Sequence, residues 1–296
     1  MPKEKLFESL FRGLSGCKLT ISNNGEIVTK TSASIKYNER LVKQIKKQKE
    51  FHCLHISNIK CPRVLEQGID ENLLEYFTME YAEGKTYDYF LNYSSPSEIS
   101  FFIDSLLSYF DSVKNTDAKY TDDEFSRICT AKIKSIRGHI PNSDFLKYLE
   151  NRILLCKNVD VPLSFCHGDL TLPNILFGNS ELFFLDFLDS YLESWVLDLV
   201  KLKQDLFYLW CIGREKKSPN VRSIQVSIKI WEEIEKKYYE KTKSEEFKIL
   251  EALNFLRIYP YLKNESDFLL INKILEKLPI YEEFNNTNGR QIFKIS

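Results

Sequence analysis

Residues 163–187 are the one extended interruption in the helical periodicity of the later two-thirds of the chain, and they constrain the fold most strongly. The segment contains CHGDLTLPNILF, a Gly-Asn turn and the apolar run LFFLDF. Two short apolar stretches on either side of a turn predict a β-hairpin. Asp169 and Asn174 stand before this hairpin and Asp186 at its far end, so folding it would bring three polar side chains toward one another.

These side chains are the groups that phosphoryl transfer requires. Mg²⁺ prefers carboxylate and amide oxygens and takes further ligands from substrate phosphates, which Asn174 and Asp186 would satisfy. Asp169 could then orient an acceptor hydroxyl and take its proton. His167 can hydrogen-bond the backbone, so we expect it to give structural support to the loop rather than to act as the base. The alternative is that Asp, Gly and Asn only form turns here.

The chain changes character near residue 90. Before it, LTISNNGEIVTKTS alternates around an Asn-Asn-Gly turn and predicts a hairpin, residues 34–51 have helical periodicity, and residues 63–81 predict two further strands. We therefore expect a sheet-rich lobe of five strands and one helix over residues 1–83. Gly84, in YAEGKT, can bend the chain between a strand and a helix, which makes it the predicted lobe boundary.

Residues 84–296 are predicted to form a helical lobe that carries the catalytic and metal-binding loops. Apolar side chains three or four positions apart predict helices over residues 97–113, 143–155, 196–210, 222–240 and 245–259. A chain of 296 residues suits one large two-lobed domain or two packed subdomains. The lysine-rich stretch 43–50 has apolar neighbours at helical spacing, which favours a solvated helix face over a polyanion site.

Composition and charge exclude several classes of protein. With 43% hydrophobic and 28% charged residues the chain is expected to be globular, and a net charge of -1 argues against nucleic acid or an anionic membrane as partner. The seven cysteines are scattered and form no C-x-x-C pair, which indicates reduced thiols and a cytoplasmic location. The cluster HCLHISNIKC has no paired ligand spacing, so a zinc site is not favoured. Because Lys3 and Lys5 are not followed by an apolar core of signal-peptide length, and no apolar run approaches membrane-spanning length, we expect neither a signal peptide nor a transmembrane segment.

The motif and its continuation, CHGDLTLPNILF with LFFLDFLDSYLESWVLDLVKLKQDL, resemble the aminoglycoside phosphotransferase and choline kinase family of small-molecule kinases. Gly168 stands between His and Asp, where eukaryotic protein kinases usually have Arg. The resemblance covers nearly the whole chain, most tightly residues 164–205. It implies an α+β, protein-kinase-like fold of two lobes, with a small sheet-rich N-lobe and a larger helical C-lobe. It also implies Asp169 as catalytic base, Asn174 and Asp186 as magnesium ligands, and Asp198 as a brace for the catalytic loop.

The resemblance further implies a nucleotide site in the first lobe. Lys30 matches the position of the strand lysine that binds phosphates, and the alternative is an exposed edge lysine. We expect two glycines in RGLSGC, Gly13 and Gly16, to close over the phosphates with backbone N–H groups. The segment FTMEYAEG resembles the linker between lobes, in which the backbone meets adenine and a side chain walls its pocket; the residues concerned are Met79, Glu80 and Ala82. Core packing would also explain the methionine.

The acidic partner expected for Lys30 is missing. Gln44 occupies the matching position on the next predicted helix, and Glu39 and Glu50 stand on other turns. A glutamine would hold the lysine through a neutral hydrogen bond, roughly half as strong as a charge-assisted one. The partner is therefore left open.

The acceptor is predicted from acids and aromatics that follow the metal loop. Carboxylates and aromatic rings suit cationic aminoglycosides, choline or sugars, and the candidate substrate residues are Asp189, Tyr191 and Glu193. Asp198, Asp205, Trp195 and Trp210 lie in or beside the same segment. Glu193 could instead complement a helix dipole. DFLDSYLES departs from the DFxxAxxGDP continuation of drug-resistance enzymes, which favours a hydroxyl of a sugar or amino sugar, in a role such as cell-surface polysaccharide metabolism.

The predicted function is an ATP- and Mg²⁺-dependent phosphotransferase that acts on a small hydroxylated molecule. The alternatives are a choline or aminoglycoside kinase, and a catalytically silent kinase-like module that binds nucleotide or regulates. A kinase acting on protein hydroxyls is disfavoured because no Ala-Pro-Glu sequence closes an activation segment after Asp186.

Overall fold

The computed structural model describes residues 16–22, 24–114, 116–214 and 220–292, the last five by their backbone alone. By its internal contacts the chain divides into two compact units. The first contains the chain as far as Tyr87 with His167–Asp169 and Asn174–Asp189, and the second contains the rest. The boundary between residues 83 and 84 stays a prediction, but these units assign the two loop segments to the N-terminal side rather than to the helical part.

The first unit contains a four-stranded antiparallel sheet with strand order β1-β2-β5-β4. The strands are β1 (Lys18–Ile21), β2 (Ile27–Thr31), β4 (Val64–Ile69) and β5 (Glu75–Glu80). Gly25 closes the predicted first hairpin with a φ of 77°, a conformation that glycine adopts without steric cost. In the second hairpin the Asp70 carboxylate accepts the N–H groups of Asn72 and Leu74, at 2.8 and 2.9 Å. Both hairpin predictions are confirmed.

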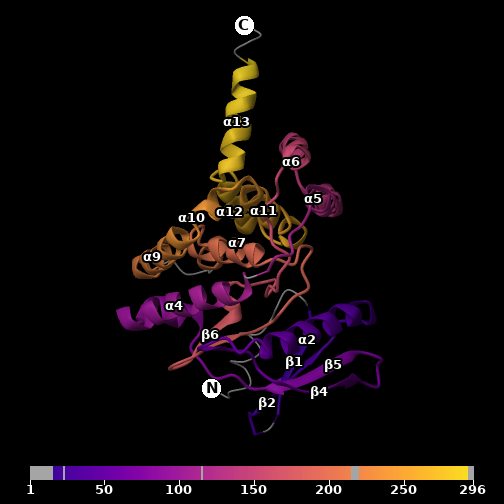
Figure 1. The fold of residues 1–296 in the computed structure, drawn as a ribbon. Coiled ribbons are helices and arrows are strands. Elements are labelled where there is room, and N and C mark those ends of the chain that lie inside the picture. Colours follow the sequence, from indigo (N-terminus) through magenta and orange to yellow (C-terminus); the bar gives the residue numbers. More distant parts are fainter. Residues whose placement is uncertain (1–15, 23, 115, 215–219, 293–296) are drawn as a thin grey trace. The chain divides into compact units, whose positions relative to one another are not determined.

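Helix α2 (Asn38–His52), entered through a short 3-10 turn (Ile35–Tyr37), lies across this sheet (Figure 1). It corresponds to the helix predicted over residues 34–51. Its buried residues Leu41 and Ile45 are one turn apart and pack with Phe77 of β5. This packing holds one face of α2 against the sheet, where the helix contacts β5 and β4.

A second, three-stranded sheet has the order β3-β7-β6. Strand β3 (Ile59–Lys60) pairs in parallel with β7 (Leu182–Phe184), and β7 pairs antiparallel with β6 (Ile175–Phe177). The predicted late hairpin is therefore β6–β7. Among the described residues before Gly84 there are five strands, and one of them belongs to this other sheet. Sequence patterning does not reveal that pairing, because β3 has two residues and its partner is far along the chain.

The chain from residue 87 onward is mainly helical. The helices are α3 (Tyr87–Tyr93), α4 (Pro96–Val113), α5 (Asp122–Ile136), α6 (Ser143–Leu155), α7 (Trp195–Leu206), α8 (Trp210–Gly213), α9 (Val221–Lys237), α10 (Tyr239–Lys243), α11 (Glu245–Leu256), α12 (Glu265–Leu275) and α13 (Pro279–Ile292). Helices α4 and α5 begin with complete capping boxes, Ser95 with Glu98 and Thr121 with Glu124. In the described part of the chain, no helix combines the length and apolarity that crossing a bilayer requires.

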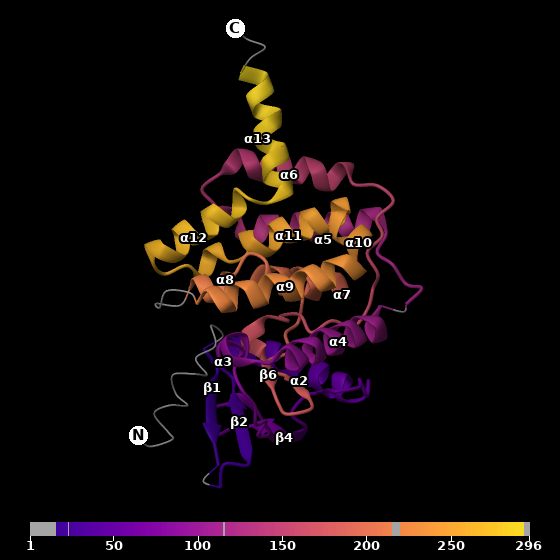
Figure 2. The ribbon, with the colours of Figure 1, turned by 90° about the vertical axis from the view of Figure 1, so that its left-hand side faces the viewer.

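Helix α7 is the most buried element of the second unit. All of its residues are buried, and it contacts α9 and α11, which lie beside it in Figure 2. Asp198 and Asp205 are 0% and 1% exposed, so both side chains are buried; the prediction that they lie in or beside the segment that faces the acceptor stays a prediction. Trp195 and Trp210 are buried as well. The apolar surroundings of the helix, which a single sequence does not show, decide this.

Candidate active site

The motif HGD forms a tight loop in which Gly168 has a φ of 86°. The His167 ring is fully buried, and its Nδ1 accepts the backbone N–H of Asp169 at 3.2 Å. Burial lowers the pKa of His167 to about 4. The ring is therefore neutral near pH 7 and its Nδ1 is already engaged by the loop, as expected for a supporting residue.

The loop is tied to the segment around Asp186 by backbone hydrogen bonds. The Leu185 N–H donates to the Asn174 carbonyl at 2.9 Å, and the Leu188 N–H donates to the His167 carbonyl at 3.0 Å. The ring of Phe187 packs on His167 with centroids 4.3 Å apart. Two segments that are separate in sequence are thus fixed against each other inside the first unit.

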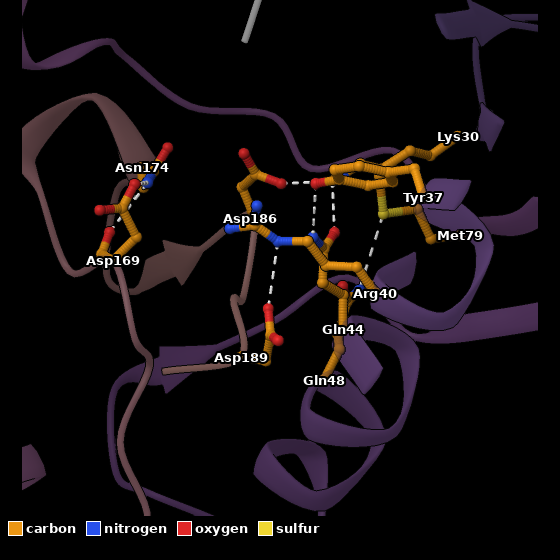
Figure 3. A network of polar contacts seen from close by, with 10 residues as sticks. All are labelled: Lys30, Tyr37, Arg40, Gln44, Gln48, Met79, Asp169, Asn174, Asp186 and Asp189. Atoms are coloured by element: carbon orange, nitrogen blue, oxygen red, sulfur yellow. Dashed lines mark hydrogen bonds and ion pairs between the residues drawn. The ribbon is translucent and has the colours of Figure 1, made fainter. Parts of the chain in front are cut away.

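Asn174 is oriented by Asp169. Its Nδ2 donates to the Asp169 carbonyl at 2.8 Å and to the Asp169 carboxylate at 3.2 Å. Because the amide nitrogen of Asn174 points to Asp169, the amide oxygen of Asn174 is turned away from Asp169 (Figure 3). An amide oxygen here and a carboxylate at Asp186 form a donor set whose chemistry fits Mg²⁺.

Asp186 adopts a left-handed backbone conformation with a φ of 59°. Its carboxylate forms an ion pair with Lys30. In Figure 3 Asp186 lies between the Asp169–Asn174 pair on one side and the Lys30 contact on the other. Non-glycine residues in this conformation are uncommon, and they are concentrated at active sites and ligand-binding sites.

Lys30 lies on β2 and is 6% exposed, so the alternative of an exposed edge lysine is wrong. Its Nζ donates to Gln44 Oε1 at 3.0 Å, and Gln44 Nε2 donates to the Tyr37 hydroxyl at 2.9 Å. The two alternative acids instead face lysines of their own helix. Glu39 pairs with Lys43 at 2.8 Å and Glu50 with Lys46 at 3.7 Å. The partner of Lys30 on α2 is therefore the neutral Gln44.

Comparison with known proteins identifies the family that this geometry belongs to. The model of the phosphotransferase enzyme family matches residues 20–217. The chain belongs to the phosphotransferase enzyme family. No curated protein sequence matches it.

Solved aminoglycoside phosphotransferases share the fold. A ternary complex of APH(2″)-IIa with streptomycin and ATP has a TM-score of 0.55 at 13% identity, over 95% of this chain and 99% of that one. An APH(4)-Ia mutant with ADP and hygromycin B has a TM-score of 0.56 at 12% identity, over 92% and 96%. The GDP complex of the 2′-phosphotransferase-IIIa has a TM-score of 0.56 at 12% identity, over 92% and 98%. The family resemblance and the α+β, protein-kinase-like fold are confirmed.

Helix α2 also holds the segment after Asp186. Arg40 Nε binds Asp189 Oδ1 at 3.1 Å, and Lys47 Nζ donates to the Leu188 carbonyl at 2.8 Å. Lys47 is 8% exposed, so the prediction of a solvated lysine face is wrong for this residue. Sequence reasoning missed both contacts, since a lysine-rich helix ordinarily faces water.

The three predicted substrate residues have internal contacts. Asp189 is paired with Arg40. The Glu193 carboxylate accepts the Ser190 N–H at 3.1 Å and the Cys166 thiol at 3.2 Å. The Tyr191 hydroxyl is buried, which raises the pKa of Tyr191 above its usual value. A contact between these side chains and an acceptor stays a prediction.

The predicted nucleotide linker lies at the end of β5. The Met79 sulfur is 3.6 Å from Gln48 Nε2, and the side chain packs on the Leu41 cluster. Glu80 forms an ion pair with Arg63 at 3.0 Å. The contacts of Met79, Glu80 and Ala82 with adenine stay predictions.

The structure describes two of the three residues predicted to cover the phosphates or to brace the catalytic loop. Gly16 has a φ of 71°, which suits a tight turn, and Gly13 lies outside the described residues. The Asp198 carboxylate accepts the Tyr109 hydroxyl at 2.5 Å inside the second unit. The roles of these residues toward phosphates and the catalytic loop stay predictions.

Proposed function

We propose that the protein transfers the γ-phosphoryl group of ATP to a hydroxyl group of a small molecule. One observation carries the proposal: Lys30, Asp169, Asn174 and Asp186, from distant parts of the sequence, gather within one compact unit. Family membership and the fold shared with phosphotransferases solved as nucleotide complexes support it.

Each of these side chains has a role that its surroundings favour. Asp169 would accept the proton of the acceptor hydroxyl, and its contact with Asn174 keeps the carboxylate oriented. Asn174 and Asp186 would hold Mg²⁺, which when bound neutralises charge on the phosphates. Lys30 would bind inner phosphates from β2, held by Gln44 at 3.0 Å.

We propose a sugar or amino sugar as the acceptor, in a process such as cell-surface polysaccharide metabolism. The sequence DFLDSYLES favours this over the drug substrates of the solved relatives, because it departs from their usual continuation. The second candidate is a silent nucleotide-binding module. The neutral Gln44 in place of an acid is the observation that favours it.

The test is ADP release with Mg-ATP across amino sugars, neutral sugars, choline and aminoglycosides. Asp169→Asn should lower acceptor-stimulated turnover by about 10²- to 10⁴-fold while nucleotide binding stays near normal, because the variant loses its base. Asp186→Ala should weaken Mg²⁺-dependent nucleotide binding. Asp160→Asn is the matched control, since Asp160 forms ion pairs with Lys119 and Lys241 at 2.5 and 2.7 Å.

The outcomes separate the two candidates. Nucleotide binding without ADP release for any acceptor class would support the silent module. Wild-type turnover in Asp169→Asn would refute the proposed mechanism. Stimulation by choline or aminoglycosides alone would replace the proposed acceptor and keep the reaction.

A further inference from the structure

The charge of Lys30 is balanced by the same carboxylate that is predicted to bind the metal ion. Among the described residues, its Nζ donates to the amide oxygen of Gln44 at 3.0 Å and to the carboxylate of Asp186. Lys30 and Gln44 are 6% and 2% exposed, so water screens the ammonium poorly on this side. Asp186 is therefore the anion that neutralises Lys30, and all three residues belong to the first unit.

Helix α2, which is described over its whole length, gives Lys30 no acidic partner. The two acids of this helix face lysines one turn away, in the pairs Glu39–Lys43 and Glu50–Lys46. The amide of Gln44 is fixed in its orientation, because its Nε2 donates to the Tyr37 hydroxyl at 2.9 Å and its Oε1 then faces Lys30. A neutral amide orients the ammonium group without compensating its charge.

A cation bound to a carboxylate weakens the attraction of that carboxylate for a second cation. Asp186 has a single negative charge, and the ammonium of Lys30 repels any divalent cation that approaches the same group. If an acid stood at position 44, it would share the charge of Lys30 and leave more of the Asp186 charge for a metal ion. The neutral Gln44 therefore makes Lys30 and a metal ion competitors for one carboxylate.

We propose that Gln44 is a positioning residue that sets, through Lys30, how strongly Asp186 binds a divalent cation; this inference rests on the proposed function. With an amide at this position, Asp186 binds a divalent cation tightly only when Lys30 has another anion. Under the proposed function, the phosphates of a nucleotide are that anion. The site therefore binds the free cation weakly and takes it up together with a nucleotide.

Gln44 could instead serve packing alone, and that alternative predicts a different response. A purely structural glutamine, when replaced by glutamate, would change the stability of the protein and leave its cation affinity unchanged. A glutamine that controls the Lys30–Asp186 pair changes cation affinity in protein that is fully folded.

The experiment titrates the full chain with Mn²⁺ in the absence of nucleotide and measures free Mn²⁺ by electron paramagnetic resonance. Gln44→Glu should raise the affinity for Mn²⁺ by at least about fivefold, because the added carboxylate shares the charge of Lys30. Lys30→Met should raise it as well, because the competing ammonium is gone. Lys47→Met is the matched control. It removes a buried cation of α2 that donates to the Leu188 carbonyl at 2.8 Å, and it should leave Mn²⁺ affinity nearly unchanged.

A double-mutant cycle separates competition for Asp186 from a general effect of charge. In the Lys30→Met background, Gln44→Glu should add little Mn²⁺ affinity, because no ammonium remains for the carboxylate to engage. An equal gain with and without Lys30 would overturn the proposal. A gain in Lys47→Met as large as that in Lys30→Met would overturn it too, as would unchanged affinity in folded Gln44→Glu.

NMR of the wild type gives a readout that needs neither activity nor a variant. In protein with ¹⁵N-labelled lysine, the ammonium signal of Lys30 should shift at saturating Mg²⁺, because Asp186 then binds the metal ion in place of the lysine. A Lys30 signal that stays in place at saturating Mg²⁺ would overturn the proposal, even if every variant failed to fold.

Failure of the proposed function has a separate signature. If neither the wild type nor any variant bound Mn²⁺ or Mg-ATP, the proposed function and the role of Gln44 would both fall. Acceptor-stimulated ADP release by the wild type, with unchanged Mn²⁺ affinity in Gln44→Glu, would refute the role of Gln44 alone. Higher Mn²⁺ affinity in Gln44→Glu, without ADP release for any acceptor, would support the role of Gln44 and refute phosphoryl transfer.

Discussion

At the scale of single residues, Gln44 distinguishes this site from one built around an ion pair on α2. Its amide accepts from Lys30 at 3.0 Å and donates to Tyr37 at 2.9 Å. A neutral partner leaves the charge of Lys30 to be balanced by Asp186, with which it pairs. Under the proposed function, that charge would become available to phosphates once a metal ion engages Asp186.

His167 gives a prediction about pH. Its folded-state pKa is about 4 because the ring is buried, whereas an unfolded-state imidazole titrates near 6.5. Between these values only the unfolded chain binds the proton, so the stability that the neutral ring contributes above pH 6.5 is lost as pH falls toward 4. The free energy of unfolding should drop by about 2 kcal/mol between pH 7 and pH 5 from this group.

Urea denaturation at the two pH values checks this expectation. The control is His167→Asn, whose amide oxygen can accept the Asp169 N–H but does not titrate. Its stability should be lower overall and should change less between pH 7 and pH 5. An equal loss in wild type and variant would assign the pH dependence to other groups.

At the scale of elements, α7 contributes a lysine to a buried ion pair, and the burial makes this pair costly to break. Lys203 and Glu251 pair at 2.6 Å with side chains 8% and 2% exposed. Aromatic rings surround the Lys203 amine at 5.3 to 5.8 Å, from Phe207, Tyr208, Trp231 and Phe247. Burial of such a pair requires that each charge keeps its partner.

The element-scale prediction is a double-mutant cycle on that pair. Lys203→Met should lower the free energy of unfolding by about 3–5 kcal/mol, because Glu251 is left buried without its cation. The double variant Lys203→Met/Glu251→Leu should recover most of the loss, since neither charge remains buried. Chemical denaturation measures all four proteins. Additive losses in the double variant would show that the two residues do not stabilise each other.

At the scale of the whole molecule, the first unit is assembled from three separate stretches of chain. Strand β3 finds its partner in β7, and the ring of Phe51 on α2 packs on Phe184 and Phe187 at 5.6 and 5.0 Å. Residues 174–189 therefore provide both the strand that pairs with β3 and the aromatic rings that pack on Phe51 of the N-terminal stretch.

We predict that residues 1–87 alone do not fold. Without the later segment, β3 has no strand to pair with and Phe51, which is 2% exposed in the full chain, loses its ring partners. Far-UV circular dichroism and the dispersion of amide NMR signals check this, with the full chain as control. A dispersed spectrum and a cooperative thermal transition for the fragment would contradict the prediction.

The sequence alone determined the hairpins, most of the helices, and the motif that carries Asp169, Asn174 and Asp186. These features follow from local rules of periodicity, turn chemistry and residue spacing. Helix α5 was missed although its capping signal at Thr121 is readable. Only the tertiary structure decided that Gln44 holds Lys30, that β3 joins the later sheet and that α7 is buried, because each depends on contacts between segments distant in sequence, which local patterns do not encode.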